Sequence, residues 1–362
     1  MPGPPEDHPT EMTPGTPVRP TGELINATTG SENLRSLPAT SDQPVETAPE
    51  TLQTQVITRA PVSCRYLQLA AGLLRAARPR QWVKNVLVLA APVAAGRLGS
   101  LAEAGQLGVV FVLFTGAAAA VYLFNDVMDA EADRAHPRKC HRPIASGIVR
   151  PPVACATSAL LATAAMAGAA EFCNAPATLV IGVYLVLQVA YCTVLKHQLV
   201  VDLVLVAAGF LMRAMIGGLA IGIPISRWFL ITAGFGALFI VASKRYSESR
   251  STRDQGGATR ALLVTYTAGY LRFVWQLAAG LTLAGYCLWA LDGSTFARPA
   301  LAATLPWRQL SIVPFVLSVL RYAVFTDRAT AGSPEDVVLG DRPLMVIGLI
   351  WAALYGCAVA GV

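Results

Sequence analysis

Long apolar stretches separated by short polar segments run from Trp82 to the end of the chain. A bilayer core about 30 Å thick requires about 20 mostly apolar residues per transmembrane helix. The pattern therefore predicts nine transmembrane helices, near residues 84–97, 105–124, 150–170, 176–193, 200–222, 227–242, 266–290, 306–325 and 343–361. The first stretch is short, and only residues 222–227 separate the fifth from the sixth, so a count of eight is also open.

Composition agrees with this pattern. Of the 362 residues, 54% are hydrophobic and only 14% are charged, which excludes a water-soluble globular protein and predicts an all-α integral membrane protein. The first 58 residues differ, because they hold eight Asp and Glu against Arg19 and Arg35. Such a segment buries too little apolar surface to offset the entropy of ordering it. We therefore expect a disordered acidic extension over residues 1–60 and a transmembrane domain over residues 61–362.

Basic residues gather on one side of the predicted helices. With a cytoplasmic amino terminus, nineteen Lys and Arg lie at inner helix ends or in inner loops, and four lie in outer loops. This positive-inside bias predicts a multi-pass protein of a bacterial inner (plasma) membrane, surrounded by lipid, with the acidic residues 126–133 facing the cytoplasm. Topology accounts for most of the basic excess, so nucleic-acid binding is not indicated. Seven single cysteines imply neither zinc nor a disulfide framework.

Residues 125–143, NDVMDAEADRAHPRKCHRP, concentrate charge at the end of an apolar stretch. At about 100° per residue, Asp126, Asp129 and Asp133 fall on one face of a helix. Carboxylates so close repel one another unless a cation lies between them, and hard oxygen ligands beside phosphate oxygens suit Mg²⁺. The spacing therefore predicts that these three aspartates bind Mg²⁺ and, through it, a diphosphate. Asn125 is expected to bind the ligand or to orient a carboxylate.

A solvated helix end is the alternative, in which the acids pair with Arg134, Arg138 and Lys139. However, the apolar run GAAAAVYLF leads directly into Asn125 and Asp126. The first carboxylate is therefore at membrane depth, where ionisable groups are costly and usually functional. This depth favours a binding site.

Basic side chains near this motif and at other inner helix ends can donate charge-assisted hydrogen bonds to phosphate oxygens. Lys84 lies inside the apolar opening of the first predicted helix, where simple snorkelling is the alternative. Arg213 lies in mid-helix, where an ion pair with Asp202 and a phosphate ligand are equally open. The substrate-binding candidates are Asn125, Arg138, Lys139, Arg142, Tyr191, Lys196, Arg213, Lys244 and Arg245, and the catalytic candidates are Lys84, Asp126 and Asp129.

The motif resembles a known family. NDVMDAEAD matches the NDxxDxxxD signature of the UbiA superfamily of intramembrane prenyltransferases, and HPRKCHRPIASG resembles the HPxKxxRPIxxG sequence that follows it there. Within the superfamily, the branch most similar to this chain transfers a phosphoribosyl group to a lipid phosphate. That likeness rests on RPRQWVKNVLVLAAP, LKHQLVVDLVLVAAGFLMRAMIGGLAIGIPIS and SKRYSE, and the resemblance as a whole covers about residues 70–361.

The resemblance implies a catalytic bundle of nine transmembrane helices around a cytoplasm-facing cavity, in which Mg²⁺ holds phosphoribosyl diphosphate (PRPP). The phosphate of decaprenyl phosphate, or of another polyprenyl phosphate, would attack the anomeric carbon of the ribose. The products would be diphosphate and decaprenyl-phosphoryl-5-phosphoribose, a lipid precursor for arabinogalactan and lipoarabinomannan in the cell wall. A homo-oligomer remains open.

The chain departs from ordinary prenyltransferases at the second acidic motif. Those enzymes carry a DxxxD motif on a later loop, whereas this chain has Lys196, His197 and Asp202 in one loop and Lys244, Arg245 and Glu248 at the start of another. Extra cations suit a donor with a 5-phosphate and an acceptor phosphate better than a prenyl diphosphate. Transfer of a prenyl group to an aromatic acceptor is the alternative activity. A transporter for an anionic metabolite is a further alternative, although no inverted repeat is evident.

Overall fold

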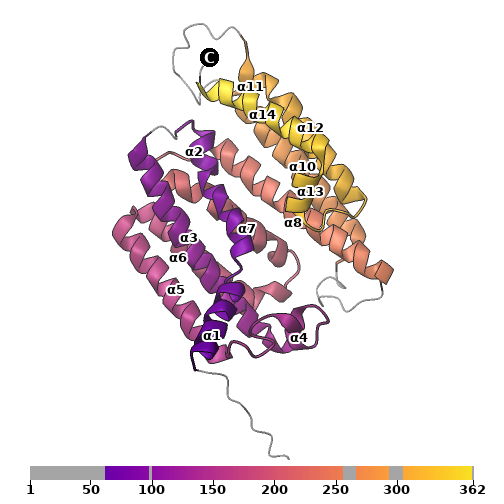
Figure 1. The fold of residues 1–362 in the computed structure, drawn as a ribbon. Helices are drawn as coiled ribbons and strands as arrows, with labels where there is room; N and C mark the ends of the chain where they lie inside the picture. Colours follow the sequence, from indigo (N-terminus) through magenta and orange to yellow (C-terminus); the bar gives the residue numbers. More distant parts are fainter. Residues whose placement is uncertain (1–61, 98–99, 256–265, 293–304, 361–362) are drawn as a thin grey trace, which may run out of the picture. The chain divides into compact units, whose positions relative to one another are not determined.

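The computed structural model describes residues 62–97, 100–255, 266–292 and 305–360, all of which lie within one compact unit, Arg59–Val362. Throughout these ranges the regular elements are helices (Figure 1). They are α1 (Val62–Ala76), η1 (Pro79–Leu89), α2 (Ala90–Ala94), α3 (Leu101–Met128), α4 (Ala130–Arg134), η2 (Lys139–His141), α5 (Pro151–Phe172), α6 (Ala175–Thr193), η3 (Leu195–His197), α7 (Val201–Ala220), α8 (Arg227–Gln255), α10 (Ala268–Leu291), α11 (Trp307–Leu310), α12 (Ile312–Asp327), α13 (Pro334–Gly340) and α14 (Arg342–Ala360). The extension expected over residues 1–60 lies outside the described residues.

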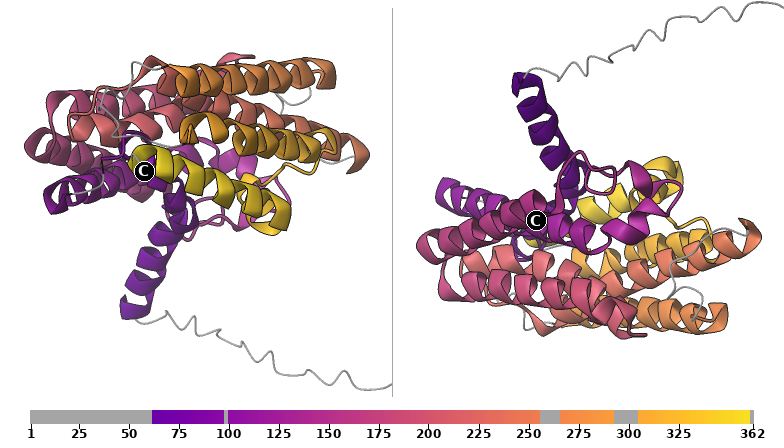
Figure 2. Two further views of the ribbon diagram at one scale, coloured as in Figure 1. Left: turned by 90° about the horizontal axis from the view of Figure 1, so that it is seen from above. Right: turned by 90° about the horizontal axis from the view of Figure 1, so that it is seen from below.

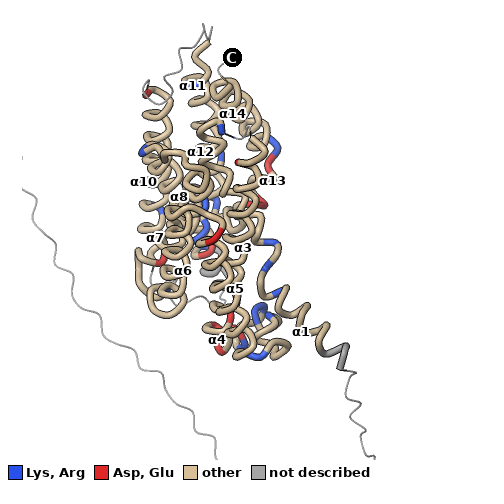
Figure 3. The backbone as a smooth tube through the Cα atoms, turned by 90° about the vertical axis from the view of Figure 1, so that its left-hand side faces the viewer, with Lys and Arg blue, Asp and Glu red and all other residues tan. Residues whose placement is uncertain are grey.

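Eight helices in the described ranges are long and apolar enough to cross a membrane. They correspond to the second to ninth stretches predicted from the sequence, with α11 and α12 together forming the eighth. Many large apolar side chains on them are exposed, among them Val112, Leu160, Val186 and Leu349. Such a surface suits lipid contact. Figure 3 shows charged residues around α4 and beside α13, whereas they are few along the long helices. The all-α membrane fold is confirmed, and the count agrees with the eight left open rather than with nine.

The first predicted span, residues 84–97, does not form one long helix. A 3-10 helix, η1, is followed by the five-residue helix α2, and Pro79 and Pro92 lie within this segment. Its position depends on close packing against α7. A Cβ built on Gly217 would lie 1.9 Å from the carbonyl oxygen of Val88, so only glycine allows this contact. The small residues of α7 therefore permit close packing against η1.

The long helices form two groups around separate cores. One core is built by α3, α5, α6 and α7, and includes Phe114, Ile181 and Tyr184. The other is built mainly by α8, α10 and α12, and includes Tyr246 and Trp275. Figures 1 and 2 show these groups side by side, with α7 packed against α8 where they meet. The site described below draws residues from both groups.

Helix α3 carries the acidic motif at its carboxyl end. It begins after Ser100, whose hydroxyl accepts a hydrogen bond from the Glu103 backbone N–H, as expected for an N-cap. The alanines at 117–120 are buried, and Ser158 of α5 donates to the Ala120 carbonyl at 2.7 Å. This packing fixes the last turns of α3, and with them the position of Asp126.

Candidate active site

The acidic motif spans a break between two helices. Helix α3 ends at Met128, α4 begins at Ala130, and Asp129 between them has φ −93° and ψ 0°, in the sparsely populated bridge region. The three aspartates are therefore not carried by a single unbroken helix. The Asp129 N–H still donates to the Asn125 carbonyl and the Asp133 N–H to the Asp129 carbonyl, so the three aspartates stay on one side.

Asp126 and Asp133 share one cation. Arg142 Nη1 donates to Asp126 Oδ1 at 3.2 Å and to Asp133 Oδ2 at 2.6 Å, and both aspartates are at most 3% exposed. The Arg78 guanidinium donates to Asp126 as well. Arg78 has φ +56° at the junction between α1 and η1, an uncommon conformation for a residue with a side chain. These two arginines place positive charge directly against the paired carboxylates.

Asp129 faces a different set of partners. The Lys196 ammonium, on η3, donates to Asp129 Oδ1, and Asn125 Nδ2 donates to Asp129 Oδ2 at 3.0 Å. The Cys192 thiol in turn donates to Asn125 Oδ1 at 3.5 Å. Asp129 is thus directed toward the α6–α7 connection, whereas Asp126 and Asp133 converge on Arg142.

A second charged group surrounds Asp202, at the start of α7. The Tyr191 hydroxyl donates to Asp202 Oδ1 at 2.7 Å, and Arg245 Nη2 lies 3.2 Å from Asp202 Oδ2. Arg245 also pairs with Glu248 at 3.2 Å, and Lys244 lies 3.9 Å from the same carboxylate. Arg245 is therefore the basic partner of Asp202, and the pairing of Asp202 with Arg213, one of the two alternatives that the sequence left open, is not formed.

The loop that leads to Asp202 is unusual in its backbone. Val200 has φ +66°, which a β-branched residue rarely adopts, and its N–H donates to the Tyr266 hydroxyl at 2.8 Å. Burial raises the pKa of the Tyr266 phenol, so this hydroxyl stays protonated. The strained turn aims the start of α7 toward the charged group.

Arg213 is a buried cation held by neutral groups. Its Nε donates to Asn85 Oδ1 at 2.9 Å, its Nη1 to the Gly209 carbonyl at 2.8 Å, and its Nη2 to the Tyr184 hydroxyl at 3.0 Å. The rings of Phe114, Tyr184 and Phe210 lie 5.1–5.6 Å from its guanidinium carbon. Among the described residues, none of the carboxylates lies within ion-pair distance of Arg213. The ion-pair alternative is thus not seen.

Lys84 lies next to Arg213 along the same wall. Its ammonium is 5.9 Å from the centre of the Phe210 ring. The charged side chains that influence it most are Glu335, Lys244, Arg213 and Arg78, so three of the four are cations. Within the ranges that the structure describes, Lys84 likewise has no carboxylate at ion-pair distance. Lys84 and Arg213 together leave positive charge without a paired acid.

Two predicted residues stand apart from this arrangement. Arg138 is exposed and Lys139 is half-buried, and neither side chain is paired with the three aspartates. Arg78 and Cys192, in contrast, are in the site and were not among the sequence candidates. The positive φ of Arg78 is seen only in the structure. The Arg-Pro-Arg sequence at residues 78–80 is the only signal that could have drawn attention to this position.

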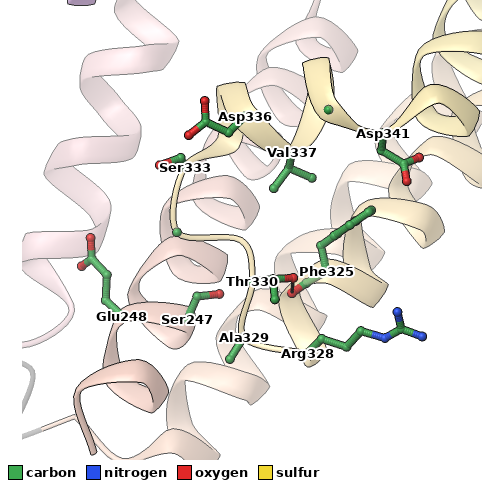
Figure 4. Close-up of a pocket in the computed structure, with 12 residues that line it drawn as sticks. Ser247, Glu248, Phe325, Arg328, Ala329, Thr330, Ser333, Asp336, Val337 and Asp341 are labelled. Carbon is green, nitrogen blue, oxygen red and sulfur yellow. Dashed lines mark hydrogen bonds between the residues drawn. The ribbon is translucent and has the colours of Figure 1, made fainter. Parts of the chain in front are cut away.

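A polar cleft lies beside the second charged group. A cavity of about 760 Å³ is bordered by Ser247 and Glu248 of α8, by the loop from Arg328 to Ser333, and by Asp336 and Asp341 (Figure 4). None of the aspartates of the NDxxDxxxD motif lines this cavity. It extends the polar region from Glu248 toward α13.

The carboxylates of the acidic motif fit a divalent cation in part. No three His, Cys, Asp or Glu side chains within the described ranges are grouped closely enough to hold a metal together. Asp126 and Asp133, however, converge on one nitrogen of Arg142, which occupies the place that a cation between two carboxylates would take. Hard oxygen donors in this pairing fit Mg²⁺. Asp129 is paired with Lys196 instead, so binding of one ion by all three aspartates stays a prediction.

Comparison with known proteins connects this geometry to a family. Residues 86–339 match the model of the UbiA prenyltransferase family. A curated Mycobacterium tuberculosis protein named decaprenyl-phosphate phosphoribosyltransferase is 45% identical over 313 residues, which are 85% of this chain and 99% of that protein. A protein of the same name from Corynebacterium glutamicum is 44% identical over 78% of this chain and 85% of its own length.

A solved structure shares the fold. The structure of a UbiA homolog from Archaeoglobus fulgidus bound to DMAPP and Mg²⁺ superposes with a TM-score of 0.60 at 17% identity, covering 80% of this chain and 99% of that one. The resemblance read from NDVMDAEAD is therefore confirmed by sequence and by fold.

Proposed function

The chain belongs to the UbiA prenyltransferase family, and we propose that it transfers the 5-phosphoribosyl group of PRPP to decaprenyl phosphate, which gives decaprenyl-phosphoryl-5-phosphoribose and diphosphate. The 44–45% identity to proteins named for this activity, over most of their length, supports the assignment. By this assignment the product serves the synthesis of arabinogalactan and lipoarabinomannan in the cell wall.

The surplus of positive charge is the structural observation that carries the proposal. Arg213 is buried among neutral and aromatic groups, and half-buried Lys84 lies beside the Phe210 ring, where three cations, Lys244, Arg213 and Arg78, outnumber the one acid that influences it, Glu335. A buried cation without an acid is costly unless an anion joins it. PRPP brings a diphosphate and a 5-phosphate, and the acceptor brings another phosphate. A prenyl diphosphate would bring one charged group and an apolar chain.

The reaction requires positioning and charge stabilisation rather than a base. An oxygen of the acceptor phosphate, already anionic, forms a bond to the ribose anomeric carbon, and the bond from that carbon to the diphosphate oxygen breaks. Positive charge develops on the ribose ring and negative charge on the leaving diphosphate. Lys84, Arg142 and Lys196 would donate to phosphate oxygens and hold the reacting atoms in line. Tyr191 and Arg245 would fix the neighbouring wall through Asp202.

Asp126 and Asp133 would hold Mg²⁺ with Asp129 nearby, and the bound ion would neutralise the diphosphate. In the arrangement described above, Arg142 and Arg78 neutralise Asp126. These arginines would then turn from the carboxylates to phosphate oxygens when the donor binds. Asn125 would keep Asp129 oriented through its hydrogen bond. Arg138 and Lys139 would contribute from the exposed loop.

The site is proposed to face the cytoplasm of a cell whose plasma membrane holds the protein. Two observations support this sidedness. Basic residues flank the helix ends that carry the aspartates, as the positive-inside rule predicts. PRPP is a charged, water-soluble donor, so its site must open to the compartment that contains it.

Membranes containing the protein can test the reaction directly. Labelled PRPP and decaprenyl phosphate should yield a lipid-linked label with Mg²⁺, and none after removal of Mg²⁺ with a chelator. In parallel, labelled geranyl diphosphate with 4-hydroxybenzoate tests aromatic prenyl transfer. Absence of lipid-linked phosphoribose, or formation of a prenylated aromatic product instead, would overturn the proposal.

Asp129→Asn provides an inactive variant for comparison in that assay. The amide keeps the size of the side chain and removes the charge that pairs with Lys196. We expect turnover to fall at least 100-fold while the protein still inserts and folds. Unchanged product formation would remove Asp129 from the site.

A further inference from the structure

Helix α1 has an apolar face that nothing in the described part of the chain covers. Tyr66, Leu67 and Leu74 are 68%, 72% and 55% exposed. At about 100° per residue they lie within one sector of the helix, together with Ala70. This segment is not among the spans predicted from the sequence, because 15 residues with two arginines are too short and too polar to cross a membrane.

The opposite side of α1 is anchored to the bundle. Leu69, Leu73 and Ala76 pack with Ile144 and Val149. The contact is close, because a Cβ on Gly72 would lie 2.8 Å from Val149 Cγ2. The open apolar face is therefore held in a fixed orientation and is not a surface that could fold back on the bundle.

The polar residues of α1 form a third sector. Gln68 and Arg75 point to the side between the packed face and the open face, and both are exposed. A helix with one apolar face on a protein, one apolar face open and a polar strip between them suits the boundary between lipid and water. Its location fits, since α1 contacts the ends of α3 and α5 that adjoin the acidic motif, and Figures 2 and 3 show it standing away from the long helices.

Charge indicates which lipid surface it meets. Residues 59–80 contain five arginines, Arg59, Arg65, Arg75, Arg78 and Arg80, and no acidic residue. Among Arg75, Arg78 and Arg80, whose side chains the structure describes, only Arg78 forms an ion pair, with Asp126 of the site. Arg75 and Arg80 are exposed. Basic side chains beside an inserted apolar face favour anionic headgroups.

We propose that α1 lies in the membrane interface at the end of the bundle that carries the aspartates, with Tyr66, Leu67 and Leu74 inserted among acyl chains and Arg75 and Arg80 on anionic phospholipid headgroups. Arg78, two residues beyond α1, is thereby tied to the lipid surface from which a lipid substrate would enter. The location of α1 does not depend on which donor or acceptor the enzyme uses.

Tryptophan scanning in lipid nanodiscs tests the insertion. Leu67→Trp places an indole on the open face, and Gln68→Trp, one residue later, places it on the polar strip. The added fluorescence, measured against the background of the six native tryptophans, should be quenched by brominated phosphatidylcholine several-fold more at position 67 than at position 68. Equal or weaker quenching at 67 would overturn the proposal, whether water or a second copy of the chain covers that face.

Hydrogen exchange tests the preference for anionic lipid. Amides 66–76 should exchange more slowly in nanodiscs that contain phosphatidylglycerol than in pure phosphatidylcholine. Each arginine near an anionic surface contributes about a fivefold change, so Arg75→Gln with Arg80→Gln should remove most of the difference. If the exchange rates of these amides in the unaltered protein are the same in both lipid compositions, the assignment to anionic headgroups is contradicted.

Discussion

At the scale of single residues, the partners of the Arg213 side chain distinguish a binding site from a structural ion pair. Taking a guanidinium out of water costs several kcal/mol, and a carboxylate partner is the usual compensation. Here the partners are an amide, a carbonyl, a phenol and three aromatic rings. The site therefore retains a positive charge that an anionic substrate can neutralise.

Arg213→Met is expected to separate folding from binding. The unbranched side chain fills a similar volume and removes the buried charge, so the melting temperature in detergent should change little. The KM for PRPP should rise at least tenfold, because the charge no longer faces the phosphates. Arg213→Lys keeps the charge but cannot reach Asn85, Gly209 and Tyr184 together, and should show an intermediate KM. If the KM for PRPP is unaltered in the methionine variant, Arg213 does not bind the donor and has a structural role.

The sequence identified the residue types of this site better than their partners. Spacing placed Asp126, Asp129 and Asp133 on one side, and depth in the apolar stretch marked Asp126 as unusual. Pairing could not be predicted, because Arg245 reaches Asp202 across 43 residues and Arg78 reaches Asp126 across 48. Such contacts depend on how helices pack, which local patterns do not encode.

At the scale of elements, the contact between η1 and α7 positions Lys84 and Asn85. Gly217 makes this contact possible, and any Cβ there meets the Val88 carbonyl, which is backbone and cannot turn away. The irregular form of η1 follows from tertiary packing and from prolines. A window of apolar residues could predict burial for residues 84–97, but not that the segment is a 3-10 turn instead of a long helix.

Gly217→Ala should therefore destabilise the fold by about 1–3 kcal/mol, as overpacking does. Gly280→Ala in α10 is the matched control, because a Cβ there meets nothing within 4 Å. In that open helical position alanine should be neutral or stabilise by up to about 1 kcal/mol. Thermal unfolding in the same detergent compares the two. Equal melting temperatures would show that η1 adjusts to α7.

The start of α14 provides a pH-dependent contact. Arg321 donates to both carboxylate oxygens of Asp341, at 3.2 and 2.8 Å, and the Leu344 N–H donates to Asp341 Oδ1. The hydrogen bond from Arg321 lowers the pKa of Asp341 below its ordinary value. A group whose pKa is lower in the folded state contributes stability above its unfolded pKa, near 3.9, and loses it as pH falls through the folded pKa.

Asp341→Asn should thus reduce the melting temperature at neutral pH, and the difference from the unaltered protein should shrink as pH falls below about 4. Melting curves at pH 7, 5, 4 and 3 would record it. Glu131→Gln serves as a control, since this exposed acid is not part of an ion pair in the described residues. If the difference in melting temperature stays constant down to pH 3, the charge of Asp341 does not contribute to the stability of the fold.

At the scale of the whole molecule, one end of the bundle concentrates the chemistry. The acidic motif and Lys196 lie at helix ends, on α3, α4 and η3, and Arg245 joins them from the carboxyl-terminal half of α8. Apolar patterning and positive charge in the loops were sufficient to predict the all-α membrane class and this grouping. Which side of the membrane the end faces is a property of the protein in its bilayer, and two native cysteines report it.

Cys140 follows the acidic motif, and Cys173 lies between α5 and α6 at the opposite end of α5. Both are half-buried, so they form a matched pair. In variants that retain one of them, an impermeant maleimide applied to intact cells should label Cys173, and should label Cys140 only after the membrane is opened. Burial raises the pKa of the Cys173 thiol, so labelling at about pH 8.5 keeps enough thiolate for reaction.

The opposite labelling pattern would place the aspartates outside the cell. That outcome would separate the site from cytoplasmic PRPP and would conflict with the positive-inside excess of basic residues. Equal labelling of both cysteines before the membrane is opened would instead show mixed insertion. Because Cys140, in η2, precedes α5 and Cys173 follows the carboxyl end of that helix, the ratio of their labelling gives the orientation of the active site without any assay of activity.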